Sequence, residues 1–247
     1  MPFDLASLDA PFATLKGYDW GADASWLKTI DDAVVAAHGD AALGADLEKR
    51  FVAVLGAGTN RAAKEYACRK LMMIGTAASV PALAALLGNA DHSHMARFAL
   101  EQIPYPEAAQ ALRDALGTVP PGLQIGMIES LGSRGDAASV PALARLLTGD
   151  PKLAAAAATA LGHIRTPEAL AALTAADPLA AAGVGRAVVD ARLVTAEALL
   201  ASGKRAEARS VYEALADAVK GKPGAKGVEL AAARGLLACL DTLAATS

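Results

Sequence analysis

The chain has 247 residues, of which 54% are hydrophobic and only 4% aromatic, and its formal net charge is −3. A core built mainly from Ala and Leu favours α-helices, because aromatic and β-branched residues are too few for an all-β domain. The acidic balance argues against a protein that binds the phosphate backbone of nucleic acids, since such proteins carry a basic surface.

The first predicted elements precede a repeated region. We expect residues 1–22 to be an extended lead-in. Two amphipathic helices follow, one over residues 26–35 and one over residues 43–55, because their apolar residues recur at helical spacing. Together they are interpreted as a divergent first repeat that caps the stack.

The central region repeats a sequence phrase. Residues 77–88 read AASVPALAALLG and residues 137–148 read AASVPALARLLT, with ten of the twelve positions identical. Weaker copies bring the number of registers to four, at intervals of about 30 residues. One buried position of the unit recurs as Leu71, Leu100, Leu131 and Leu161. Each register is predicted to contain two helices joined by a short turn, and no such unit buries its apolar face alone.

The pattern changes towards the carboxyl end. Residues 196–215 read AEALLASGKRAEARSVYEAL, with a glycine between two helical segments, and a last helix is predicted over residues 226–244. The helix pair resembles a tetratricopeptide unit. We therefore predict a HEAT-like region over residues 23–190 and a tetratricopeptide-like helical end over residues 191–247 that continues the solenoid.

The phrases DAASVPALARLL and ALGHIRTPEALAAL, within residues 71–174, resemble HEAT repeats of the short, lyase-type subclass. The segments FATLKGYDWG and SHMARFALEQIP extend the resemblance to HEAT regions of large, often exported bacterial proteins. The resemblance implies an all-α fold, a right-handed α-solenoid of stacked antiparallel helix pairs (HEAT repeats). It supplies no catalytic residue, and it implies that the natural chain is longer than these residues.

One column of the repeat contains candidate partner-binding residues. His94, Arg97 and Glu101 share one helical face, and the corresponding positions of the next repeat are Ile125 and Ile128. If this column lines the concave side of the solenoid, the five residues form a partner-binding surface. If the column is buried between helices, the two isoleucines are ordinary core residues.

Motifs for chemistry are weak in this sequence. His92 and His94 would point about 200° apart on a helix, so we expect no metal site there. Cys68 lies among basic residues, but the sequence places no histidine partner beside it, and Cys239 is far away in the chain. We expect no cofactor and no catalytic residue.

The leading hypothesis is a non-enzymatic scaffold that binds a protein partner, or a neighbouring domain of a longer natural chain, along the solenoid surface. One alternative is a HEAT-like lyase-type enzyme that acts on a chromophore–protein bond, and a second is a HEAT-like nucleic-acid-binding protein. We expect a monomer that binds no nucleic acid and no membrane. The first residues lack the features of a signal peptide, so we expect a cytoplasmic protein unless such a peptide was removed, in which case it is exported to the periplasm.

Overall fold

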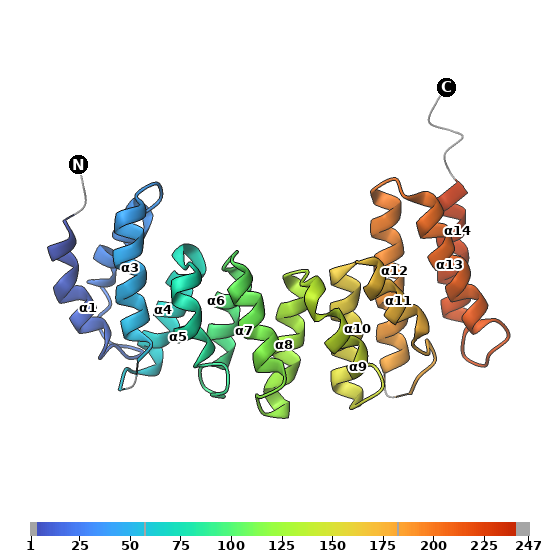
Figure 1. Cartoon of the computed structure of the whole chain (residues 1–247), viewed down its shortest axis with the longest axis horizontal. Helices are drawn as coiled ribbons and strands as arrows, with labels where there is room; N and C mark the ends of the chain where they lie inside the picture. Colours follow the sequence, from blue (N-terminus) through green and yellow to red (C-terminus); the bar gives the residue numbers. More distant parts are fainter. Residues whose placement is uncertain (1–3, 57, 182, 241–247) are drawn as a thin grey trace, which may run out of the picture. The chain divides into compact units, whose positions relative to one another are not determined.

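The structure is a computed structural model that describes residues 4–56, 58–181 and 183–240. These residues form fourteen α-helices and three short 3-10 helices, with no strand among them. Within each part of the chain, Figure 1 shows neighbouring helices stacked as pairs. The predicted fold class, an all-α solenoid of helix pairs, is therefore confirmed, whereas its right-handed sense stays a prediction.

The chain divides into two compact units, Met1–Ser130 and Leu131–Ser247. The first unit contains the helices η1 (Leu5–Leu8), α1 (Asp9–Leu15), α2 (Leu27–Ala36), α3 (Ala41–Val54), α4 (Arg61–Ile74), η2 (Ala77–Ser79), α5 (Val80–Ala84), α6 (Ser93–Gln102), α7 (Pro106–Leu116) and most of α8 (Pro121–Ser133). Here α4 packs against both α3 and α6, while α5 packs against α6 and α7.

The second unit begins with the end of α8. Its other helices are η3 (Ala137–Ser139), α9 (Val140–Leu146), α10 (Pro151–Ile164), α11 (Pro167–Ala175), α12 (Val184–Ala201), α13 (Arg205–Val219) and α14 (Lys226–Leu240). Here α10 packs against α9, α11 and α12, and α12 to α14 pack against one another. The boundary predicted between residues 190 and 191 falls inside α12, so it corresponds to no break in the backbone. Residues 241–244 of the predicted last helix lie outside the described residues.

Local sequence explains where several helices begin. The Asp150 side chain accepts hydrogen bonds from the backbone N–H groups of Lys152 and Leu153, and Pro151 occupies the first turn of α10. Thr166 caps α11 in the same way, through the N–H of Ala169. These caps satisfy N–H groups that have no partner inside the helix, and proline lacks an N–H that would need one.

The core of each unit is made of aliphatic side chains. The four residues that recur at one position of the repeat are all completely buried, namely Leu71, Leu100, Leu131 and Leu161. Their burial confirms the periodicity read from the sequence, since one leucine in each second helix of a pair points at the neighbouring helices.

The prediction of an extended lead-in over residues 1–22 is wrong for residues 5–15, which are helical. Asp4 caps η1, and α1 follows directly, with Phe12 and Leu15 buried. The Phe12 ring contacts the edge of Phe51 on α3 at a centroid distance of 5.0 Å. Leu8, Phe12 and Leu15 recur every three or four positions, so helical structure places all three on one buried face, which an extended strand cannot do.

Candidate functional site

The three polar residues of the predicted column form a hydrogen-bonded cluster on α6. Arg97 Nη1 donates to Ser130 Oγ on α8 at 2.8 Å, and the Ser130 hydroxyl donates to Glu101 Oε2 at 2.7 Å. Arg97 Nη2 lies 3.4 Å from His94 Nδ1, and Arg97 Nη1 lies 3.8 Å from Glu101 Oε2. The cluster therefore links α6 to α8.

The side chains of the cluster, Arg97 above all, pack against other residues of the first unit. Arg97 is only 8% exposed, and its guanidinium lies 4.8 Å from the centroid of the Phe98 ring. A side chain at Gly126 would place its Cβ 2.7 Å from Arg97 Nε, so the glycine leaves the space that the arginine occupies. Arg97 thus satisfies its charge within the protein and presents little surface to a partner.

The structure places most of the residues predicted as a partner-binding surface between helices, and their role in binding stays a prediction. Ile128 is 0% exposed, Ile125 and Glu101 are partly buried, and only His94 is exposed. Burial of Arg97 and Ile128 agrees with the alternative interpretation, in which the column lies between helices. The reason is that consecutive second helices pack side by side, so a column on their shared face becomes core.

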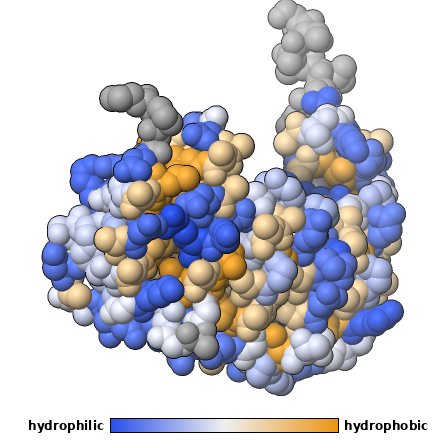
Figure 2. Space-filling model, turned by 60° about the vertical axis from the view of Figure 1, so that its left-hand side comes forward, coloured by the Kyte–Doolittle hydropathy of each residue, from blue (hydrophilic) through white to orange (hydrophobic). Residues whose placement is uncertain are grey.

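A groove of about 850 Å³ lies elsewhere in the first unit. It is bounded by the end of α2, the loop that follows it, one face of α3 and the end of α4. Two large apolar residues on its lining are open to solvent, because Val35 is 72% exposed and Met73 is 67% exposed. Figure 2 shows one face of the protein on which hydrophobic residues reach the surface between hydrophilic ones.

A buried carboxylate forms the floor of this groove. Glu48 on α3 accepts hydrogen bonds from the backbone N–H of Thr76 at 2.6 Å and of Ser79 at 3.1 Å, and from the Thr76 hydroxyl at 2.9 Å. These groups begin η2 and α5, where helical N–H groups lack partners and favour a negative charge. Glu48 therefore holds α3 to the start of the next helix pair.

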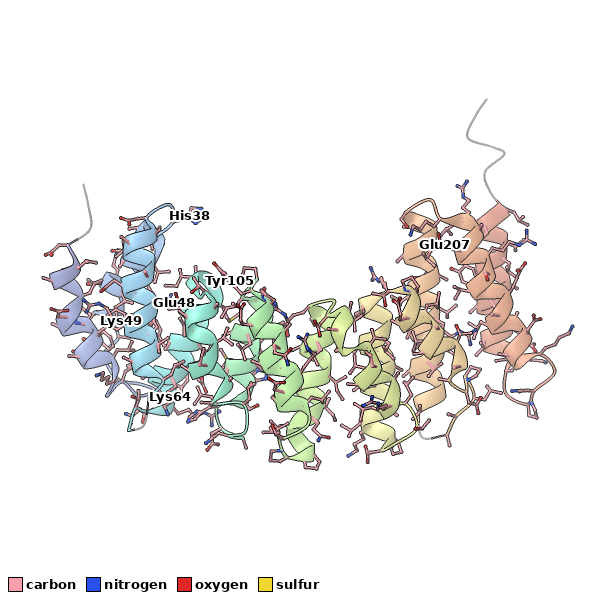
Figure 3. All side chains as sticks on the ribbon, in the orientation of Figure 1. His38, Glu48, Lys49, Lys64, Tyr105 and Glu207 are labelled. Carbon is pink, nitrogen blue, oxygen red and sulfur yellow. The ribbon has the colours of Figure 1, made fainter. Side chains whose placement is uncertain are left out.

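The rim of the groove carries basic groups. His38 lies in the loop after α2, and Lys49 follows Glu48 on α3 (Figure 3). Both side chains are exposed, and within the described part of the chain neither makes an ion pair or side-chain hydrogen bond. The apolar lining thus has a free positive charge beside it.

A second polar cluster fixes the two helices that form the walls of the groove. Asp31 on α2 accepts a hydrogen bond from the Tyr66 hydroxyl at 2.6 Å and pairs with Lys70 Nζ at 2.6 Å, both on α4. Burial alone would raise the pKa of Asp31, but the hydrogen bonds from Lys70 and Tyr66 outweigh it and lower the pKa. Burial, followed by the hydrogen bond to Asp31, raises the pKa of Tyr66 well above its usual range.

The cysteine that the sequence suggested as a possible nucleophile, Cys68, does not line the groove. Cys68 is buried, and burial raises the pKa of its thiol to about 12, so it is protonated at neutral pH. Among the described residues, no group of three metal-binding side chains comes together. In the same part of the chain, no helix has both the length and the apolar character needed to span a membrane.

Val35 and Met73 were not predicted to lie at the surface. The positions of these residues around their helices could have indicated it. Val34 and Leu71 are buried, so an apolar residue one or two positions later points away from the core. The position of the groove itself could not be found this way, since its lining comes from α2, α3 and α4.

Comparison with known families gives a match over part of the chain. Residues 119–188 match the family of HEAT repeats. No curated protein sequence matches the chain. Among solved structures, an engineered protein has a TM-score of 0.42 and 21% identity, covering 78% of this chain and 96% of its own. Human deoxyhypusine hydroxylase in complex with glycerol has a TM-score of 0.38 and 16% identity, covering 95% of this chain and 96% of its own.

Proposed function

We propose that this protein is a non-enzymatic interaction scaffold whose first unit binds a segment of a protein partner, or of a neighbouring domain, in the groove beside α3. The presence of HEAT repeats supports the class of function, because solenoids expose long surfaces that are used for recognition. The exposure of Val35 and Met73 on the lining of the groove supports its location.

Burial of these two side chains provides a driving force for binding. Large apolar side chains that remain in water gain about 1.5–3 kcal/mol each when a partner covers them completely. The groove offers them a concave setting of about 850 Å³, which is in the range of sites that enclose a few side chains of a ligand. An apolar segment of the partner is therefore the occupant that the lining favours.

The rim indicates what else the partner segment carries. Lys49 is exposed beside the apolar lining and has no acidic partner among the described residues. A carboxylate on the bound segment would pair with it and fix the register of the segment, although a pair at an exposed rim adds only about 0.2–1 kcal/mol. We therefore propose a segment with apolar anchors and at least one acidic residue.

The first test is a photo-crosslink from the groove. A photoreactive amino acid at position 73 should capture a partner, and its fragment should contain apolar and acidic residues. Binding of the purified partner is then measured by calorimetry with Met73→Glu and Lys49→Glu variants. We expect Met73→Glu to weaken binding at least about tenfold, corresponding to about 1.4 kcal/mol, and Lys49→Glu to weaken it less.

Leu230→Glu is the matched control, because Leu230 is also a large exposed apolar residue but lies on α14 in the second unit. It should leave the affinity unchanged. If Met73→Glu and Leu230→Glu bind the captured partner equally well, the groove is not the binding site.

The finer features of the resemblance belong to the same proposal. We propose that the repeats are of the lyase-type subclass, that α12 to α14 form a tetratricopeptide-like end, and that the protein is a monomer without enzymatic activity. The net charge of −3 supports a partner other than nucleic acid, since duplex binding depends on neutralising phosphates with basic residues.

A further inference from the structure

The second unit contains a buried arginine, Arg192, for which the described residues supply no counter-ion. Arg192, on α12, is only 1% exposed. Its Nε, Nη1 and Nη2 atoms are all buried, and none has a hydrogen-bond partner among the described residues. Buried charged groups are otherwise almost always paired or hydrogen-bonded, so this side chain calls for an explanation.

The position of Arg192 is one that leucine occupies elsewhere in the repeat. A side chain on Gly132 of α8 would meet Ala160 of α10, and one on Gly162 of α10 would meet Ala191 of α12. Successive second helices therefore touch in the same register, and the residue that corresponds to Leu161 in α12 is Arg192. In the four preceding registers this residue is a completely buried leucine.

The residues next to Arg192 on α12 do not supply the hydrogen-bond acceptors that water would give to an exposed guanidinium. Its neighbours on the same face of α12 are Val188, Thr195 and Ala196, all buried, and the Thr195 hydroxyl already donates to the carbonyl of Ala191 at 2.8 Å. Burial lowers the pKa of Arg192, and no carboxylate in the described part of the chain acts on it in the opposite direction. Because a guanidinium keeps its proton at any ordinary pH, the group cannot escape this cost by becoming neutral.

We propose that Arg192 binds a small monovalent anion, a halide or a small carboxylate such as formate, within the core of the second unit. The anion would accept hydrogen bonds from the guanidinium and compensate its charge, so it would act as a structural ligand of the fold. Its size is limited because the Arg192 side chain is only 1% exposed, which leaves no open access for a bulky ligand. A ligand that binds only the folded state stabilises it in proportion to the logarithm of its concentration.

The test measures the melting temperature of the full chain in chloride, bromide and formate, with gluconate keeping the ionic strength constant because it is too bulky for the site. For a site with millimolar affinity, we expect the melting temperature to rise by about 5 °C between about 1 and about 100 mM of the binding anion. The separate chloride, bromide and formate series show whether the site prefers halides or carboxylates.

Two variants of the same helix make the test specific. Arg192→Met removes the buried charge, so it should abolish the dependence on anions and be more stable than the wild type at low anion concentration. Arg186→Met removes an exposed charge, since the Arg186 side chain is 88% exposed, and it should keep the wild-type dependence. A bromide-soaked crystal of the wild type should also show an anomalous peak in contact with the Arg192 guanidinium.

The proposal is overturned if the wild type shows no dependence on these anions and no bromide peak at Arg192. It is also overturned if all three proteins respond equally, because that result describes a general effect of salt. The measurements on the wild type decide the matter even if Arg192→Met does not fold.

Discussion

At the scale of single residues, two glycines lie where neighbouring helices of the second unit approach each other closely. A Cβ at Gly162 would lie 2.8 Å from the Cβ and 2.9 Å from the Cα of Ala191, and Gly132 is equally close to Ala160. These are backbone and short side-chain atoms that cannot move aside cheaply. Glycine is therefore required here by the separation of the helices, since helix propensity alone favours alanine.

Substitutions of two helical glycines by alanine should have opposite effects. Gly162→Ala should lower the free energy of unfolding by about 1–3 kcal/mol, because the added methyl group overpacks the contact with α12. Gly44→Ala, in α3, should raise it by up to about 1 kcal/mol, because nothing lies within 4 Å of the added atom and alanine favours the helix. Urea unfolding of both variants measures these changes, and a shift of the same sign in both would contradict this account of the close contact.

At the scale of elements, consecutive helix pairs are joined by specific polar links as well as by apolar packing. The carboxylate of Glu48 reaches from α3 to the backbone that begins η2, and Arg97 reaches from α6 to Ser130 on α8. Each link pairs a group that would otherwise be buried without a partner. These links fix the register between elements, which apolar contacts alone specify less strictly.

Removal of the Glu48 carboxylate should loosen the start of the next helix pair. We expect Glu48→Ala to lower the free energy of unfolding by about 1–3 kcal/mol, because it leaves the Thr76 N–H without its acceptor and removes one of the two acceptors of the Ser79 N–H. Glu48→Gln should cost less, since its amide oxygen can still accept. The control is Glu213→Ala, which removes an exposed pair with Arg209 and should change stability by no more than about 0.5 kcal/mol in a denaturation experiment. Equal losses in Glu48→Ala and Glu213→Ala would show that the link is not structural.

At the scale of the whole molecule, the chain consists of two compact units, each with its own buried aliphatic core. In repeat proteins stability is the sum of contributions from each repeat and from its contacts with its neighbours. Damage to the core should therefore spread only as far as these local contacts allow. The two units differ in their functional features, because the groove lies in the first and Arg192 in the second.

Core truncations should act mainly within their own unit. Leu47→Ala in α3 and Leu161→Ala in α10 each remove a completely buried side chain and should cost about 2–5 kcal/mol. In hydrogen-exchange measurements, Leu47→Ala should accelerate exchange mainly in residues 4–130, and Leu161→Ala mainly in residues 131–240. Equal acceleration throughout the chain for both variants would mean that the two units unfold as one.

Much of the fold could be predicted from the sequence, because its signals are local. The periodic leucines from Leu71 to Leu161 and the caps at Asp150 and Thr166 depend on residues a few positions apart, and the structure places them as expected. The helix at the amino end was missed, although its apolar residues have helical spacing, since its short length made the signal weak.

The candidate site depended on the tertiary structure. Helical spacing placed His94, Arg97 and Glu101 on one face, but the packing of α8 onto α6 decided that this face is internal. The groove combines residues of three helices. The lack of a partner for Arg192 among the described residues depends on which side chains of other helices come close to it. Sequence by itself thus determined the repeat and its aliphatic core, because helix formation and amphipathic phase are properties of neighbouring residues. Only the tertiary structure decided which side chains reach solvent and which are left unpaired, because both depend on contacts between helices distant in the chain.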